Sequence, residues 1–269
     1  MSSAPRSNTY PEPQVLALSV LSLIVLWFCA AWIGGDPTVL PGPLEVWGIA
    51  QAEALSGELP RHMMATLFRV AAAFSLAMAV GLVVGIAMGL NNRLNRWFGA
   101  WLTVLLNIPA LVVIVLCYLW IGLNEVAAIT AVALNKMAMV AVTIREGVHA
   151  LDPKVSDMAR VYRMSILARL HHVVLPQLWP FIAASTRNGL AIIWKIVLVV
   201  EFLGRSNGVG FQIHLYFQLF ETGYVLAYAL SFTLLMLLIE FGVLQVWERR
   251  VTRWRRPSAE MREREPTPA

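Results

Sequence analysis

The segment at residues 152–176, DPKVSDMARVYRMSILARLHHVVLP, joins two long apolar stretches and is longer than a connection between neighbouring helices needs. Asp152 followed by Pro153 is a typical helix N-cap and first-turn pair, and Ser165 can cap a second short helix. Each helix would carry one apolar stripe: Val155, Met158, Ala159 and Tyr162 in the first, then Ile166, Leu167, Leu170, Val173 and Val174 in the second. Leu175 and Pro176 would end the second helix and start the next span. The pattern predicts an amphipathic helical hairpin.

A hairpin of this kind has two possible uses. Its apolar faces can pack against the rest of the same chain, or one of its helices can lie in a groove of another protein. The residue pattern alone leaves both uses open.

The chain around the hairpin is strongly apolar. Hydrophobic residues make up 58% of its 269 residues and charged residues 14%, and the mean hydropathy is +0.67, which is more apolar than a water-soluble domain. A helix needs roughly 20 mostly apolar residues to cross about 30 Å of hydrocarbon. Six stretches have this length: 14–33, 64–90, 98–121, 125–144, 178–200 and 224–247. The sequence predicts an all-α polytopic membrane protein with about six transmembrane helices.

These spans divide the chain into an N-terminal tail (1–13), a first anchor helix (14–33), an external segment (34–63), a core transmembrane domain (64–247) and a basic, disordered tail (248–269). The first stretch could instead be a signal peptide, or residues 26–29 a lipoprotein cleavage site. It is long for a signal core, and Arg6 is its only early cation, so we interpret it as a retained anchor. In the external segment, the prolines predict a turn and then a short amphipathic helix that could contact an extracytoplasmic partner, with its apolar face formed by Val46, Trp47, Ala50 and Ala54.

The basic residues predict the orientation in the membrane. With the N-terminus inside, most of the 21 lysines and arginines fall in cytoplasmic segments, and only Arg61 and Arg205 lie on the outer side. Both termini are therefore expected in the cytoplasm. The basic run at residues 249–256 could bind nucleic acid, but beside a span it is better interpreted as an anchor to lipid headgroups, and we expect no nucleic-acid partner.

The hairpin also resembles a loop of a known protein family. The residues that carry the resemblance are Asp157-Met158-Ala159, then Arg163, then Val173-Val174-Leu175-Pro176. They resemble the EAA loop of binding-protein-dependent ABC importer permeases, which reads Glu-Ala-Ala, three residues, Gly, nine residues, Ile-x-Leu-Pro. The spacing is kept, although Asp157 stands for the Glu, Met158 for the first Ala, Arg163 for the Gly and Val173 for the Ile. The similarity covers nearly the whole chain after the first span and is closest to permeases for sulfonates, taurine, nitrate and related molecules.

The resemblance implies a type I ABC importer permease (MetI-like) fold in a bacterial inner membrane. It further implies a homodimer, two ABC ATPase subunits that use the ATP, and a periplasmic binding protein that delivers a small, anionic solute. The chain would need no cofactor of its own. The residues expected to couple it to the ATPase are Asp157, Met158, Ala159, Tyr162, Arg163, Val173, Leu175 and Pro176.

Arg163 departs most from that pattern. The family's Gly lets the chain turn between the two short helices, and a non-Gly residue is strained in a left-handed turn. We expect Arg163 either to extend the first helix by a residue or to contact the ATPase directly.

Ionisable residues within the spans are costly and normally face protein or a watery cavity. Arg187 and Lys195 can look to one side of the fifth span, and Lys136 lies on the fourth. Together with Glu201 they are candidates for the translocation path, where the cations would favour anions. Alternatively, Arg187 snorkels to the interface and Lys195 pairs with Glu201 or Glu240. Arg69 is interpreted as a snorkelling interface residue.

Two other functional classes remain as alternatives. A secondary transporter or channel could share the buried charges, but we see no inverted repeat or pair of broken helices. An intramembrane enzyme could use the histidines, yet His171-His172 lacks the i, i+4 spacing of two metal ligands, and the chain has no G-x-S-x-G elbow. Cys29 and Cys117 lie in apolar stretches and are expected to be free thiols. A GxxxxGK[ST] phosphate loop is also absent from the sequence, so the chain is not itself an ATPase of that type.

Overall fold

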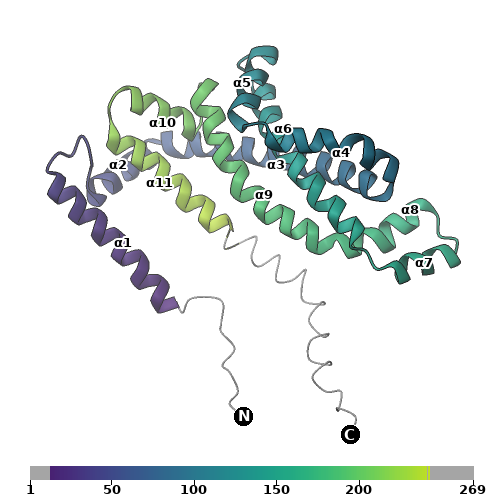
Figure 1. Cartoon of the computed structure of the whole chain (residues 1–269). Coiled ribbons are helices and arrows are strands. Elements are labelled where there is room, and N and C mark those ends of the chain that lie inside the picture. Colours follow the sequence, from purple (N-terminus) through teal and green to yellow (C-terminus); the bar gives the residue numbers. More distant parts are fainter. Residues whose placement is uncertain (1–12, 241, 243–269) are drawn as a thin grey trace, which may run out of the picture.

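In the computed structural model of the chain, residues 13–240 and 242 are described, and all regular structure in this part is helical (Figure 1). The α-helices are α1 (Pro13–Gly34), α2 (Pro43–Ser56), α3 (Glu58–Leu90), α4 (Asn92–Asn107), α5 (Ala110–Ile121), α6 (Glu125–His149), α7 (Pro153–Val161), α8 (Ile166–Arg169), α9 (Leu175–Gly204), α10 (Val209–Gln218) and α11 (Thr222–Ile239). A π-helical turn, η1 (Leu170–Val174), joins α8 to α9. The all-α prediction is confirmed for these residues.

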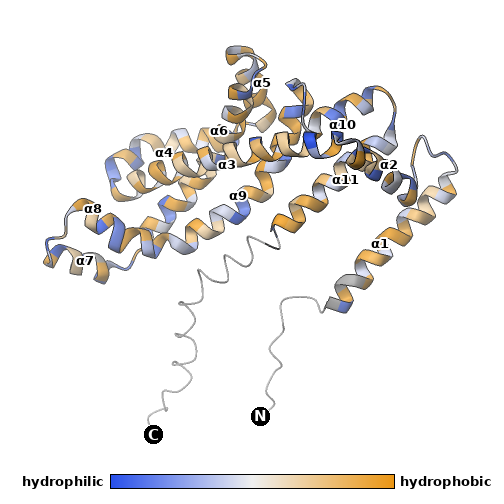
Figure 2. Ribbon diagram, turned by 180° about the vertical axis from the view of Figure 1, so that it is seen from behind, coloured by the Kyte–Doolittle hydropathy of each residue, from blue (hydrophilic) through white to orange (hydrophobic). Residues whose placement is uncertain are grey.

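Three of the described helices, α3, α6 and α11, are long and apolar enough to cross a membrane. The helices α1 and α9 cover the first and fifth predicted spans, but neither meets the same criterion of length and hydropathy, so the described residues hold three such helices, or four with the bent pair, where about six were predicted. Helix α9 carries Arg187, Lys195 and Glu201 along its 30 residues. The sixth predicted span is helical up to Ile239, and most of the remainder lies outside the described residues. In Figure 2, hydrophobic residues predominate along α1 and α11, whereas hydrophilic residues interrupt α9.

The third predicted span, 98–121, is wrong as one straight helix. The stretch is divided between α4 and α5, which are bent by 98° relative to each other. Pro109 explains the position of the break, because its ring restricts the preceding residue to extended conformations, and Ile108 has φ −74° and ψ 124°. Helix α4 therefore ends at Asn107, and α5 runs in a different direction while packing Ile114 and Cys117 against the core (Figure 1). By length and composition, this pair makes at most one span.

Helices α3 and α6 pack closely because α3 has a small residue at every fourth position. These residues are Ala73, Ala77, Gly81, Gly85 and Gly89. A Cβ atom added at Gly81 would lie 2.6 Å from Val140 Cβ, and one added at Gly85 would lie 2.6 Å from the carbonyl oxygen of Ala141. Small residues on one helix face let two backbones approach, which is a common way to join helices in membranes. The core around this contact also includes residues of α5 and α9: Ile114, Cys117, Ile193, Val197 and Val200.

The external segment forms the predicted short helix, α2, but its apolar side chains do not share one buried face. Val46 is buried, whereas Trp47 is exposed. Helix α3 begins at Glu58, six residues before the predicted start of the second span, and only Gly57, with φ +86°, separates it from α2. Helix α1 stands apart from the bundle (Figure 1) and is tied to the following loop by a hydrogen bond from Trp27 Nε1 to the Pro41 carbonyl.

Candidate functional site

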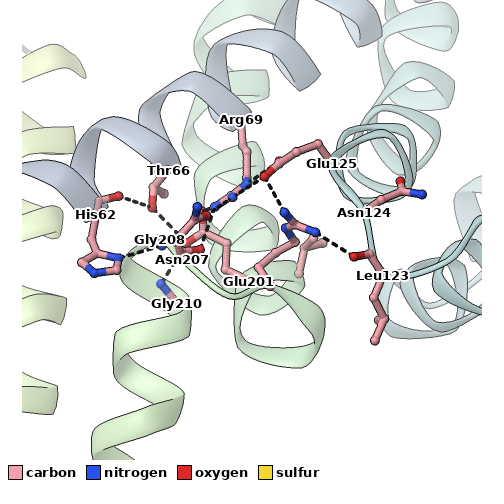
Figure 3. Close-up of polar contacts among 12 residues, drawn as sticks. His62, Thr66, Arg69, Leu123, Asn124, Glu125, Glu201, Asn207, Gly208 and Gly210 are labelled. Carbon is pink, nitrogen blue, oxygen red and sulfur yellow. Dashed lines mark hydrogen bonds and ion pairs between the residues drawn. The ribbon is translucent and has the colours of Figure 1, made fainter.

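At one end of the bundle, Arg69 of α3 lies at the centre of a polar network (Figure 3). Only 3% of the residue is exposed. Its Nε and Nη2 donate to the two carboxylate oxygens of Glu125 at 2.8 and 2.6 Å, and its Nη1 donates to Glu201 Oε1 at 2.6 Å. Nη1 and Nη2 also donate to the Asn207 backbone carbonyl and side-chain oxygen. The prediction that Arg69 snorkels to the interface is wrong, because the guanidinium is buried and fully hydrogen-bonded within the protein.

Glu201 of α9 is the buried partner in this network. It has no solvent exposure, and besides Arg69 its carboxylate accepts hydrogen bonds from Thr66 Oγ1 and the Gly210 amide, each at 2.9 Å. Burying a carboxylate is tolerated when a cation and further donors satisfy it, as here. These bonds occupy Glu201, so it is not the partner of Lys195, and it does not line an open passage in this structure.

The turn between α9 and α10 is held against α3 by the same network. The Gly208 amide donates to His62 Nδ1 and the Val209 amide donates to Thr66 Oγ1, each at 2.9 Å. Gly208 has φ +109°, and a Cβ atom there would lie 2.4 Å from the Glu201 carboxyl carbon. Both the left-handed backbone and the close carboxylate therefore require glycine at this position.

The hydrogen bond from Gly208 fixes the tautomer of His62. Because Nδ1 accepts, the ring proton lies on Nε2, which is 2.7 Å from the Gln212 amide and 3.3 Å from Glu58 Oε2. When the Gln212 side-chain amide is oriented with its Oε1 toward the ring, Oε1 accepts the Nε2 proton. This orientation gives a partner to an oxygen that otherwise has none. His62 is therefore a buried structural residue and is not arranged as a free catalytic base.

The network joins four elements. Arg205, at the end of α9, completes it by donating to Glu125 Oε1 at 2.6 Å and to the Leu123 carbonyl at 2.9 Å. Together these bonds fix the relative positions of α3, the start of α6, the end of α9 and the turn to α10 (Figure 3). This pairing was not predicted, although two opposite charges embedded in apolar stretches were a signal for it.

The hairpin, residues 152–176, lies beside the other end of α9 (Figure 1). Its predicted caps are confirmed: Asp152 accepts from the Lys154 amide at the start of α7, and Ser165 accepts from the Ala168 amide at the start of α8. Between the two helices, Arg163 has φ +47°. The Met164 amide donates to the Ala159 carbonyl, and the Arg163 amide donates to the Arg160 carbonyl, each at 3.0 Å.

These two bonds form a Schellman motif, which normally has glycine in the left-handed position. Arg163 therefore adopts the turn conformation of the glycine that it replaces in the family pattern. The alternative that Arg163 extends the first helix is wrong, because α7 ends at Val161 and the chain turns directly after Tyr162. The role of its guanidinium in contacting a partner stays a prediction.

The second half of the hairpin differs from the prediction. Leu175 and Pro176 do not end a separate helix, because α8, η1 and α9 follow one another without a break. In the π turn, the Leu175 amide donates to the Leu170 carbonyl five residues earlier. Pro176 has no amide hydrogen, so the continuous helix lacks one backbone hydrogen bond where the π turn passes into α9. The hairpin is thus joined to α9 by continuous helix.

The apolar residues of the hairpin are divided between an inner and an outer set. The inner set is buried against the chain: Ala159, Val173 and Val174. The outer set is strongly exposed: Val161, Tyr162, Ile166 and Leu167. Met158 is half-exposed, Asp157 is exposed, and Val155, Leu170, Leu175 and Pro176 are partly exposed. Both predicted uses of the apolar faces are therefore compatible with the structure, each served by different residues.

The candidate path residues occupy two different environments. Lys136 of α6 is 3% exposed and its ammonium donates to Met139 Sδ at 2.9 Å. Arg187 and Lys195 are exposed on α9, and Lys195 Nζ lies 5.5 Å from the centroid of the Trp194 ring. Among residues 13–240 and 242, no three His, Cys, Asp or Glu side chains are placed to hold a metal ion.

Comparisons with known proteins agree with this architecture. Residues 77–253 match the family described as "Binding-protein-dependent transport system inner membrane component". The chain is 31% identical over 234 residues, 87% of this chain and 84% of the relative, to the "Putative aliphatic sulfonates transport permease protein SsuC" of Bacillus subtilis (strain 168). It is 28% identical over 254 residues, 91% of this chain and 92% of the relative, to the "Taurine transport system permease protein TauC" of Escherichia coli (strain K12).

Solved structures share the fold. A chain of the MetNI methionine ABC transporter in an inward-facing conformation has a TM-score of 0.66 at 18% sequence identity, covering 74% of this chain and 99% of that one. A chain of an amino acid ABC transporter with histidines has a TM-score of 0.61 at 21% identity, covering 74% and 97%. The fold predicted from the resemblance, that of ABC importer permeases, is confirmed. The chain belongs to the family of inner membrane components of binding-protein-dependent transport systems.

Proposed function

We propose that this protein is the permease subunit of an ATP-driven ABC importer and that the hairpin docks on the ATPase. The single observation that carries the coupling role is the outer set of exposed apolar residues, at the point where a short hairpin continues into the 30-residue helix α9. Tyr162 is 76% exposed, Ile166 87% and Leu167 78%. Large apolar side chains gathered on a polar-rimmed surface mark a contact site.

Two copies of this chain, two ATPase subunits and an extracytoplasmic binding protein would form the complete transporter. The family name supports the binding protein, and the relatives' names support a transport permease; the number of copies is part of the proposal. The N-terminus and the C-terminal basic run would both be cytoplasmic, where that run contacts anionic lipid. Movement of the ATPases would reach the bundle through η1 and α9, because no flexible loop separates them from the hairpin.

The proposed solute is a small anion such as a sulfonate, taurine, nitrate or a related organic molecule. Two observations support it. The relatives are named for aliphatic sulfonates and taurine. The membrane part of α6 and α9 also carries Lys136, Arg187 and Lys195, which would give a passage beside them a positive field.

The docking proposal is tested by co-purification. The permease is extracted in mild detergent, and the amount of cognate ATPase that accompanies it is measured. Leu167→Asp places a charge on the exposed apolar surface, so we expect at least about a tenfold loss of bound ATPase. Leu55→Asp is the matched control, because Leu55 is 90% exposed on α2, which is far from the hairpin along the chain.

The buried Ala159 is unsuitable for this test, because a substitution there would disturb the hairpin itself. Equal ATPase recovery with Leu167→Asp and Leu55→Asp would contradict docking through the hairpin surface.

A further inference from the structure

A small cavity between α6 and α9 contains polar groups whose hydrogen-bonding capacity is not satisfied within the described residues. It is lined by Lys136, Met139, Val140, Thr143, Ser185 and Asn188. Its volume is about 10 Å³, which admits about one water-sized atom. It lies within the helices that form the apolar bundle, so each polar group there needs a specific partner.

Lys136 makes no strong hydrogen bond in this cavity. Its side chain is almost fully buried, and its ammonium donates to Met139 Sδ, a weak acceptor for a cation with three donors. In the described part of the chain, no carboxylate lies within ion-pair distance of it. Arg69 provides the contrast, because that buried cation has two carboxylates and an asparagine.

Ser185 is a second and independent sign of an absent partner. It is 5% exposed, and its hydroxyl has no hydrogen-bond partner within the described residues, although buried hydroxyls normally find one. The hydroxyl opens into the same cavity as Lys136. Thr143 differs, because its hydroxyl already donates to the Met139 carbonyl at 3.0 Å.

The available groups are those that would bind an anion. Lys136 supplies an ammonium, Ser185 a hydroxyl and Asn188 an amide, and no acidic side chain lines the cavity. The cavity holds one atom, so it would take a single oxygen of a larger group. Asn188 is exposed on α9, so the rest of the group would lie along that exposed face, which also carries Lys195.

We propose that Lys136, Ser185 and Asn188 form a binding site within the membrane for one oxygen of an oxyanion, the sulfonate or carboxylate group of the transported solute. This inference rests on the proposed function and deepens it by giving the solute's charged group a defined place. The site would stabilise the anion where hydrocarbon would otherwise exclude it, since charge-assisted hydrogen bonds are strong away from water.

The test uses the purified full-length permease in detergent, without its ATPase. Its thermal unfolding is followed as sodium ethanesulfonate is added, with sodium acetate and sodium chloride as parallel titrations at matched ionic strength. We expect ethanesulfonate and acetate to raise the unfolding temperature of the wild type. Lys136→Met should require at least about tenfold more anion for the same shift, and Ser185→Ala about two- to tenfold more. Arg96→Met, which removes an exposed cation outside the cavity, should respond like the wild type.

Each of the following results would contradict the proposed binding site. An unchanged anion response in Lys136→Met would show that the ammonium does not bind the anion. An equal response to chloride would show an adventitious ion only. If Lys136→Met lowers stability with no anion dependence, the lysine is paired with a protein group such as a carboxylate of a second copy. Because no ATPase takes part, loss of co-purification would contradict the proposed function alone, and loss of the anion response would contradict the site alone.

Discussion

Gly208 shows how one residue determines the turn that the polar network holds. Its backbone lies at φ +109° and ψ 168°, and its missing side chain leaves room for the Glu201 carboxylate. Gly122 has nearly the same backbone, φ +94° and ψ 169°, but a Cβ atom there would meet only Asn124 Nδ2, at 3.7 Å. Alanine substitutions at these two positions therefore distinguish the energetic cost of the backbone conformation from that of the steric clash.

We predict that Gly208→Ala destabilises the protein more than Gly122→Ala. Both alanines should lose about 1–3 kcal/mol from the unfavourable backbone. Only Gly208→Ala must also displace a buried carboxylate that accepts hydrogen bonds from three neighbouring groups. The measurement is the unfolding temperature of the two variants in the same detergent, and equal losses would show that the Glu201 contact does not restrain the turn.

The sequence predicted single residues well where the determinant was local. The caps at Asp152 and Ser165 depend on amides two or three residues away, and the strain at Arg163 follows from its place in a glycine pattern. The contact between Arg69 and Glu201 joins residues 132 positions apart, which no local pattern specifies. Each charge was therefore assigned separately: the assignment of Arg69 to the interface is wrong, and that of Glu201 to a passage stays a prediction.

At the scale of helices and turns, the hairpin depends on a left-handed residue that is not glycine. A left-handed conformation costs an L-residue roughly 1–2 kcal/mol, so Arg163 persists because the Schellman bonds on both sides hold it. The same motif recurs at the end of α10, where Phe220 has φ +59° and the Glu221 amide donates to the Tyr216 carbonyl. Two turns of this chain thus place a large residue where glycine is usual.

We predict that Arg163→Gly makes the turn more stable and Arg163→Ala does not. Glycine removes the side-chain strain, and its net gain is about 1 kcal/mol or less because it also adds freedom to the unfolded chain. Protection of the Arg163 and Met164 amides from hydrogen exchange measures the effect. The affinity of each variant for the ATPase is a second measurement. Equal losses of affinity in Arg163→Gly and Arg163→Ala would show that the guanidinium contacts the ATPase. If Arg163→Gly binds as tightly as the wild type, the residue contributes to binding only through the turn conformation.

The elements themselves were predicted to different degrees. Apolar length located α1, α3, α6, α9 and α11, because a helix in hydrocarbon must satisfy its own backbone, whereas α10 was not predicted. The break of the third span at Pro109 was not predicted, and its 98° angle depends on how α5 packs against α6 and α9. The π turn was not predictable, since it arises where α8 must continue into α9 through Leu175 and Pro176. The stripe of small residues on α3 was present in the sequence and was missed.

At the scale of the whole molecule, three features lie along α9, from its first residues to its last. The hairpin continues into its first residues, the cavity of Lys136 and Ser185 lies along it, and the Arg69 network holds its last turns. A helix of 30 residues is about 45 Å long, so α9 connects the hairpin to both other features, although Pro180 inside it removes one backbone hydrogen bond. Motion imposed at the hairpin would therefore act on both the proposed anion site and the network.

The most direct test of this account is solute uptake by proteoliposomes that contain the permease and its cognate ATPase, with the binding protein outside and ATP inside. We predict uptake of radiolabelled ethanesulfonate or taurine that requires ATP and falls at least about tenfold with Leu167→Asp. Leu167→Met, which keeps an apolar side chain at the same position, should transport normally. Uptake that is equal with and without ATP, or equal in the two variants, would contradict the claim that the hairpin couples this permease to an ATPase.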